Sequence, residues 1–286
     1  LAHSILPSVV AFPPSGVTLV GAPARARRAI DAKNTIFSAK RLMGQGFRSY
    51  AASKFKAQYP FDIVEREGMP AFRTRQGVFT PGEIAAKVIE RGIDELFVDG
   101  ATVRTVVTVP AAFDDRARLA TMEAAARAGL LDVQVVPEPV AAVHAYLRHA
   151  PADLGRVAVF DLGGGTFDVA IVECRGNEAK VIGYGGDPYL GGDDLDATLA
   201  SWVAQRVLER HGWDLRNDPE VMDRLVVQCE YAKVRLGLDT EASIELSQVD
   251  PAAPIANQRV KIERSAFEAL SRELVSGTFV ICDQVL

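Results

Sequence analysis

Cysteine is scarce in this sequence, and the cysteines that are present lie far apart. The 286 residues include only three, Cys174, Cys229 and Cys282. Zinc sites and disulfide frameworks use cysteines at short, recurring spacings, which these positions do not have. The pattern predicts structural thiols in a reducing compartment, and we expect a cytoplasmic protein.

Long apolar runs and basic stripes are also lacking. No run approaches the roughly 18 apolar residues of a membrane span, and no signal-peptide pattern is visible. The net charge of −5 argues against a nucleic-acid surface. We therefore expect neither a membrane nor a nucleic acid as partner. The densest basic cluster, Arg25, Arg27 and Arg28, is expected to be a solvated helix face.

What is present is the composition of a globular protein with alternating strands and helices. Hydrophobic residues make up 48% and charged residues 24%, and the length predicts two lobes or more. A strand at 103–109, a helix from Asp114 or Asp115 to Ala128, a strand at 133–136 and a helix through Leu147 follow one another. This order predicts an α/β fold with parallel strands.

The flanking regions are predicted more coarsely. Before residue 100 we expect a hairpin at 8–20, a helix from Asn34 or Thr35 to Met43, irregular chain at 48–80 with short strands at 61–64 and 71–73, and a helix at 81–97. After Pro151 we expect strands at 157–160, 167–172 and 180–184, helices at 193–210 and 218–236, strands at 243–246 and 259–262, and a helix capped by Ser265.

The strongest chemical signal is the segment from Asp161 to Asp168, which contains three successive glycines. Without Cβ atoms, their backbone N–H groups can approach an anion closely. A P-loop would need a lysine and a helix here, and a dinucleotide fingerprint would also open a helix. Because Phe167 to Val172 has a strand composition, we predict a strand–loop–strand phosphate site. A plain hairpin turn is the alternative.

Two further side chains are candidates for phosphate chemistry. On the predicted helix, Lys40 points into an apolar arc, where a lysine must reach either water or an anion. Glu138 lies between two prolines at the end of a strand, where open α/β sheets bind ligands. The alternatives are a lysine stem that reaches solvent and a carboxylate that caps the next helix.

Two other segments have both a functional and a structural interpretation. Paired glycines at 185–186 and 191–192 precede a helix with acidic residues in its first turn. They permit a second close backbone approach to an anion, although the acidic residues also fit the helix dipole. Glu230 and Lys233 project from one helix face and could grip a ribose, or form a surface ion pair.

Taken together, these motifs resemble the ATPase domain of the DnaK-type heat-shock protein 70 chaperones. The resemblance covers nearly the whole chain in family order. The matching stretches are 34–44, 107–113, 138–142, 161–168, 190–196, 214–218 and 230–233. It implies an α/β, actin-like (ribonuclease H-like) fold, incomplete here, with two lobes closing on Mg-ATP.

The resemblance also implies domain limits. Lobe I would span 1–151, with an outer subdomain at 1–80 and an inner one at 81–151. Lobe II would span 152–286, with an inner subdomain at 152–189, an outer one at 190–275 and a return to the inner one at 276–286. The peptide-binding domain would be absent.

The same resemblance assigns roles to individual residues. Lys40 would contact the γ-phosphate and the attacking water, while Glu138 and Asp161 would organise the magnesium shell through water. Asp168 would support the catalytic water. The remaining implied positions are Gly163, Gly164, Gly165 and Thr166 for phosphates, Gly191, Gly192 and Asp193 beside them, Glu230, Lys233 and Gly237 for the nucleoside, and Pro110 and Arg118 as an allosteric relay.

Several positions depart from the family pattern. Pro137 replaces an asparagine in the relay, Gly237 a serine that holds the nucleoside, Val234 an arginine that packs on adenine, and Ala112 an aromatic residue. The first phosphate loop of the family is expected before Leu1, and its closing adenosine motif is expected beyond the other end of the chain. We therefore expect the chain alone to bind ATP poorly and to be inactive.

The implied function is Mg-ATP binding and hydrolysis coupled to the capture and release of unfolded peptides, with ATP or ADP and Mg²⁺ as cofactors. A J-domain co-chaperone and a nucleotide exchange factor are the implied protein partners. Three alternatives stay open at this point: a regulatory relative with weak ATPase activity, an actin-like filament protein, and a small-molecule kinase.

Overall fold

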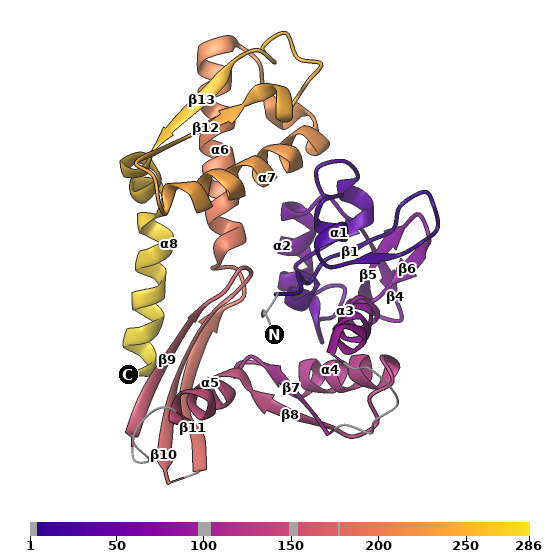
Figure 1. Cartoon of the computed structure of the whole chain (residues 1–286), viewed down its shortest axis with the longest axis vertical. Helices are drawn as coiled ribbons and strands as arrows, with labels where there is room; N and C mark the ends of the chain where they lie inside the picture. Colours follow the sequence, from indigo (N-terminus) through magenta and orange to yellow (C-terminus); the bar gives the residue numbers. More distant parts are fainter. Residues whose placement is uncertain (1–4, 97–103, 149–153, 177) are drawn as a thin grey trace.

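A computed structural model describes residues 5–96, 104–148, 154–176 and 178–286 (Figure 1). Within them the chain forms a mixed α/β structure with five small sheets. We call residues 5–148 the N-terminal part and residues 154–286 the C-terminal part. The two parts stand side by side in Figure 1, and their elements face each other across the upper half of the view.

Two three-stranded sheets build the first half of the N-terminal part. In one, β1 (Val10–Ala11) lies between the antiparallel strands β2 (Leu19–Val20) and β3 (Thr35–Ile36). The other is the meander β4 (Asp62–Arg66), β5 (Met69–Thr74) and β6 (Gly77–Phe79). Their shared core includes Phe12, Phe55 and Phe72, all fully buried. The helices beside them are α1 (Ala22–Arg25), α2 (Tyr50–Gln58) and α3 (Pro81–Leu96).

The rest of the N-terminal part is the predicted parallel unit. β7 (Thr105–Val109) pairs with β8 (Val133–Pro137) in parallel, with α4 (Asp115–Arg127) between them in sequence. The Asp114 side chain accepts a hydrogen bond from the Ala117 amide at 2.8 Å, so it caps α4 as predicted. α5 (Glu138–Leu147) follows and packs against the neighbouring sheet through Val143.

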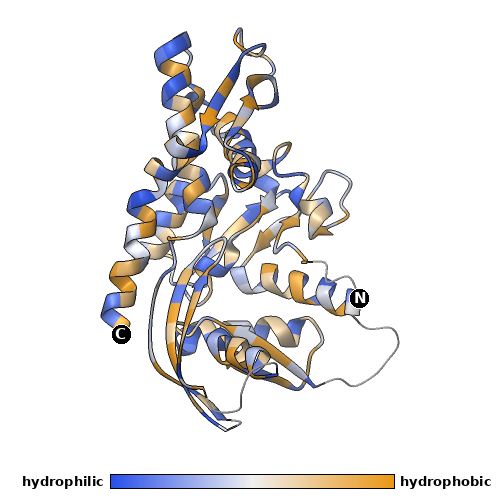
Figure 2. Ribbon diagram, turned by 60° about the vertical axis from the view of Figure 1, so that its left-hand side comes forward, coloured by the Kyte–Doolittle hydropathy of each residue, from blue (hydrophilic) through white to orange (hydrophobic). Residues whose placement is uncertain are grey.

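That neighbouring sheet opens the C-terminal part. β9 (Gly155–Leu162), β10 (Phe167–Arg175) and β11 (Glu178–Asp187) form an antiparallel sheet with β10 in the centre. α5 covers one face of it. The last helix, α8 (Arg264–Val285), lies against Phe167 and Val169 (Figure 1). Figure 2 shows hydrophilic residues recurring along α8, and no described helix is both long and apolar enough to cross a bilayer.

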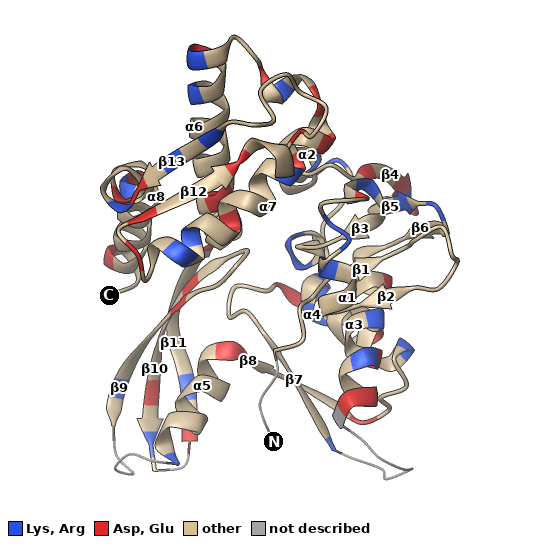
Figure 3. Cartoon of the chain, turned by 45° about the horizontal axis from the view of Figure 1, so that its top comes forward, with Lys and Arg blue, Asp and Glu red and all other residues tan. Residues whose placement is uncertain are grey.

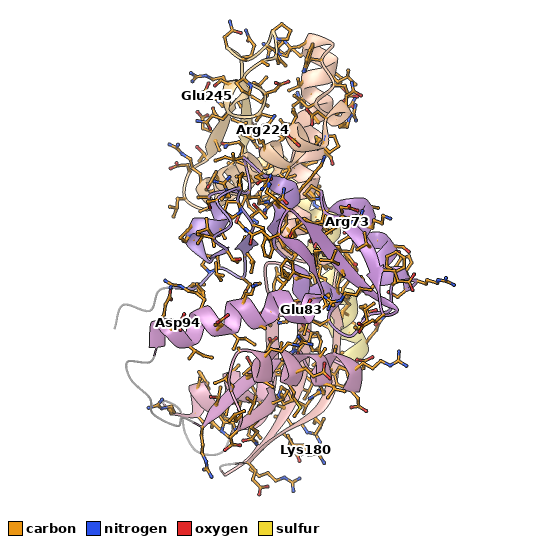
Figure 4. All side chains as sticks on the ribbon, turned by 90° about the vertical axis from the view of Figure 1, so that its right-hand side faces the viewer. Arg73, Glu83, Asp94, Lys180, Arg224 and Glu245 are labelled. Carbon is orange, nitrogen blue, oxygen red and sulfur yellow. The ribbon has the colours of Figure 1, made fainter. Side chains whose placement is uncertain are left out.

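The remaining elements form the upper region of Figure 1. α6 (Gly192–His211) and α7 (Pro219–Leu236) pack on the hairpin β12 (Glu241–Glu245) and β13 (Arg259–Glu263). Asp218 caps α7 as predicted, accepting from the Glu220 amide at 2.8 Å. Arg224, labelled in Figure 4, belongs to α7. It donates to the carbonyl of Val249 at 2.6 Å, which ties the helix to the loop after β12.

Three local predictions were wrong. Residues 35–43 do not form one helix, because Thr35 and Ile36 pair with β1 as a strand and only Ala39–Leu42 forms a 3-10 turn. The segment at 48–80 was predicted as irregular but contains α2, whose cap is Ser49. α8 begins at Arg264 and has no side-chain cap, so Ser265 does not play that role. Positions 97, 103 and the 151/152 domain limit lie outside the described residues.

Candidate functional site

A cleft between the N-terminal and C-terminal parts collects most of the predicted site residues. Its volume is about 620 Å³, and both parts line it. Figure 3 shows charged residues of both signs on the facing sides. The predicted residues that line it are Lys40, Glu138, Asp161, Gly163, Gly164, Gly165, Thr166, Asp193 and Glu230. The fold therefore brings together residues that are far apart in the sequence, because Lys40, Glu138 and the glycine loop belong to different elements.

The glycine loop is the turn of the β9–β10 hairpin. Asp161 pairs with Asp168 and Leu162 with Phe167, and the Gly163 amide donates to the Thr166 carbonyl at 2.9 Å. The prediction of a strand–loop–strand arrangement is confirmed. A Cβ added to Gly164 would meet nothing within 4 Å, and Gly164 lines the cleft, so this side of the loop is accessible from it.

The glycine pair at 191–192 packs against the glycine loop at 163–165. The amides of Gly192 and Asp193, at the start of α6, donate to the carbonyls of Gly163 and Gly164 at 3.0 and 2.7 Å. A Cβ on Gly191 would lie 2.6 Å from the Gly164 carbonyl oxygen, so only glycine permits this approach. The beginning of α6 therefore holds the phosphate-loop candidate in place.

Lys40 reaches the cleft by a different route from the one predicted. Its 3-10 turn directs it outward, and its side chain is 48% exposed. Its Nζ lies 2.7 Å from Oε1 of Glu138, the first residue of α5. The expectation that Lys40 points into an apolar arc was wrong, because that arc required a helix. The ion pair nevertheless joins two residues that the sequence analysis had named separately.

Asp168 interacts electrostatically with Lys40 and with two further carboxylates, Glu138 and Asp161. Burial raises the pKa of Asp168, and the nearby charges of Glu138 and Asp161 raise it further, while a hydrogen bond from Thr166 and the charge of Lys40 lower it. Carboxylate oxygens suit hydrated Mg²⁺, which usually keeps several of its waters. The described residues contain no group of three or more His, Cys, Asp or Glu side chains placed to ligate a metal directly. Glu138 and Asp161, which line the cleft, are the carboxylates whose chemistry suits a hydrated magnesium ion.

The structure separates Glu230 from Lys233. Glu230 forms an ion pair with Arg25 of the N-terminal part, whereas Lys233 donates to Asp196 at 2.9 Å and to the Gly192 carbonyl at 3.0 Å. The alternative of a Glu230–Lys233 ion pair was therefore wrong. Gly237 ends α7 and is not among the residues that line the cleft.

Asp196 gives the site a titratable support. Its pKa is raised to about 6, chiefly by burial. The hydrogen bond and charge of Lys233 oppose this rise, whereas the charges of Glu230 and Asp193 add to it. One of its oxygens, Oδ1, is buried without a hydrogen-bond partner. Asp196 was predicted only as a residue that stabilises the start of a helix.

We expect the Asp196→Asn variant to change the pH dependence of stability. Since the folded-state pKa lies above the ordinary value of 3.8, the neutral acid is favoured in the native state. Its contribution to stability is fully present below about pH 4 and is lost as the pH rises through about 6. The asparagine variant should lack this loss, which is on the order of 2 to 3 kcal/mol of unfolding free energy.

Urea unfolding of both proteins at about pH 4, 5, 6 and 7.5 measures the difference. Asp239→Asn is the matched control, because the Asp239 side chain is 53% exposed in its pair with Arg235. Parallel stability curves for the wild type and Asp196→Asn would show that the carboxyl does not titrate in this way.

The two predicted relay residues are linked through the turn that follows β7. Arg118 of α4 donates to the carbonyls of Phe113 and Ala111, at 2.9 and 3.4 Å, and the Phe113 amide donates to the Pro110 carbonyl at 3.2 Å. The arginine therefore holds the turn that follows β7. The structure shows that Arg118 bonds to the turn that begins at Pro110. A relay role for the two residues stays a prediction.

Two basic residues have roles that the sequence analysis missed. Arg41 is buried beside the glycine loop and bonds to it across the cleft. Arg28, expected on a solvated face with Arg25 and Arg27, stacks 3.8 Å from the Phe37 ring centre and pairs with Asp223 of α7 at 3.4 Å. The prediction of a solvated face was wrong, because this segment lies against the C-terminal part. The sequence signals for these contacts were the arginine cluster at 25–28 and the acidic residues of the segment that forms α7.

Comparison with known protein families gives a match that spans this site. The family model described as Hsp70 protein matches residues 2–286. The match covers all the elements that build the cleft, from α1 to α8.

Proposed function

Because the chain belongs to the Hsp70 family, whose ATPase domains bind nucleotide and magnesium, we propose that the cleft is a Mg-ATP site. The observation that carries this proposal is the position of the glycine hairpin opposite the Lys40–Glu138 pair. The backbone donors and the lysine suit the negative phosphate groups, and the carboxylates suit the magnesium ion that such a phosphate chain carries.

Hydrolysis in this site would rest on positioning and charge. The amides of the glycine loop would hold the phosphates, and Lys40, released from Glu138, would stabilise the charge that develops on the transferred group. Asp168 has a raised pKa and could accept a proton from the attacking water. Bound magnesium would supply charge neutralisation, with Glu138 and Asp161 orienting its water shell.

The wider architecture follows as part of the proposal. We infer an actin-like fold in which residues 1–151 and 152–286 form two lobes that close on the nucleotide. The separate hydrophobic cores of residues 9–84 and 199–262 support this division. Glu230 lines the cleft, and Lys233 donates to the carbonyl of Gly192 beside the glycine loop, which supports a nucleoside site on this side.

Family members are chaperones that bind unfolded peptides and co-chaperones. For this protein we propose that ATP hydrolysis drives the capture and release of such peptides in the cytoplasm. We also propose that it works with a J-domain co-chaperone and a nucleotide exchange factor. The turn at Pro110, which Arg118 of α4 holds, is the proposed relay between the site and the peptide-binding part.

Single-turnover hydrolysis of ATP by the full-length protein tests this function. We expect slow, magnesium-dependent turnover that accelerates when an unfolded peptide is added. Tight ATP binding without hydrolysis would contradict the proposal. It would favour a regulatory relative, with Pro137 and Gly237 the first residues to revert to asparagine and serine. Phosphate transfer to a metabolite, or nucleotide-dependent polymers in sedimentation, would instead favour a kinase or a filament protein.

A further inference from the structure

One buried side chain of the N-terminal part is bonded to the glycine loop of the C-terminal part. The Arg41 side chain is 1% exposed. Its Nε donates to the Gly165 carbonyl at 2.8 Å, and its Nη2 donates to Asp194 at 2.7 Å. A buried guanidinium is costly unless its charge and donors are paired, and these two bonds pair it.

The surroundings of Arg41 hold it in this position. The rings of Tyr189 and Tyr59 lie 4.9 and 5.8 Å from its guanidinium carbon. Tyr189 in turn donates to the Ala51 carbonyl at 2.5 Å, so both parts of the chain contribute to the contact. Aromatic rings attract a guanidinium group through cation–π interactions. Because the guanidinium is planar and rigid, it loses little conformational entropy when it is held beside them.

The bond to Gly165 completes a pattern along the loop. The carbonyls of Gly163 and Gly164 are already held by the amides of Gly192 and Asp193. Arg41 holds the third successive carbonyl. In a planar trans peptide the N–H points opposite to the C=O, so fixing three carbonyls also fixes the direction of the next three amides.

Those three amides belong to Gly164, Gly165 and Thr166, and they are free to bind an anion. Within the described residues, none of the three amides donates a hydrogen bond. All three residues line the cleft. The anchors of the first two peptides come from the C-terminal part itself. The anchor of the third comes from across the cleft, so the orientation of this peptide depends on the contact between the two parts.

We propose that Arg41 is a positioning residue that completes the phosphate-binding geometry of the glycine loop when the cleft is closed. This proposal rests on the proposed nucleotide site. Arg41 itself is not expected to touch the nucleotide, because its donors are occupied by Gly165 and Asp194. Its loss should weaken the binding of phosphate groups and leave contacts to the nucleoside unchanged.

The affinities of the full-length protein for ADP and adenosine test this selectivity. For Arg41→Ala and Arg41→Lys we expect ADP binding to weaken about tenfold to a hundredfold, as for a lost bond to a charged group, with adenosine affinity within about twofold. Lysine keeps the positive charge but lacks the guanidinium group, whose separate N–H donors bond to Gly165 and Asp194 at the same time. Arg235→Ala is the control, since Arg235 is exposed in its pair with Asp239, and should leave both affinities unchanged.

Unchanged ADP affinity in both variants, or equal losses for ADP and adenosine, would overturn the proposal. Hydrogen exchange at the amides of Gly192 and Asp193 in the nucleotide-free protein provides a test that does not depend on the proposed function. We expect faster exchange in Arg41→Lys, because these amides bond to the loop that Arg41 holds. If the wild type binds no nucleotide but this exchange accelerates, the proposed function fails while the positioning role of Arg41 stands. Unchanged exchange overturns the positioning role.

Discussion

Replacing Lys40 with alanine is expected to lower the single-turnover rate of ATP hydrolysis at least about a hundredfold, the usual cost of removing one charge stabiliser from a transition state. The Lys40 side chain lies at the cleft surface, 48% exposed, with its Nζ 2.7 Å from Glu138. Removing it therefore leaves no cavity and should change the unfolding free energy by less than about 1 kcal/mol. Rapid-quench measurements with Mg-ATP, together with urea unfolding, separate the two effects.

Lys33→Ala is the matched control for this prediction. Lys33 is also an exposed lysine, 4.0 Å from Glu220, and it does not line the cleft. Its loss should leave the rate within about twofold, since an exposed ion pair contributes little. A Lys40→Ala rate within threefold of the wild type would remove Lys40 from the chemistry and leave it as a partner of Glu138 only.

Local signals in the sequence were sufficient where the element depends on nearby residues. The caps Asp114 and Asp218 predicted the starts of α4 and α7, and the glycine run predicted the β9–β10 hairpin. Each of these features is formed within a few residues of the signal. Glu138 was likewise placed correctly, because the end of β8 fixes it directly.

The segment around Lys40 shows why a local pattern can mislead. Its apolar spacing fits a helix, yet Thr35 and Ile36 pair with β1, whose residues lie about two dozen positions earlier. Strand pairing and burial at this position outweigh helix propensity, which is a weak effect per residue. The misplaced helix directed attention to Lys40 as the inward residue, whereas the inward residue is Arg41.

Contacts across the cleft could not be predicted from spacing at all. Arg41 and Gly165 are 124 residues apart, and Arg28 and Asp223 are 195 apart. Whether an arginine is solvated or buried in such a case depends on how the N-terminal and C-terminal parts pack against each other. The sequence shows the charges of both partners but not their pairing. The pKa of Asp196 is a similar case, because burial by distant residues is its largest cause.

The close approach of the two glycine segments leads to a second large effect. We expect Gly191→Ala to weaken ADP binding about a hundredfold and to lower the unfolding free energy by about 1 to 3 kcal/mol, as overpacking does. The backbone of Gly191 is extended and tolerates any residue, so the effect comes from space alone. A Cβ there would lie 2.6 Å from the Gly164 carbonyl oxygen and 2.9 Å from the carbonyl carbons of Gly164 and Gly165.

These atoms belong to the backbone of the loop, so they can yield only if the loop moves. Such a shift would break the bonds from Gly192 and Asp193 that hold the first two loop carbonyls. Gly46→Ala is the control for both measurements, because its nearest neighbour would be 4.0 Å from the added carbon. Calorimetric ADP affinity within about threefold of the wild type in Gly191→Ala would show that the loop binds phosphate without this support. In that case the carbonyl anchors would not set the direction of the loop amides.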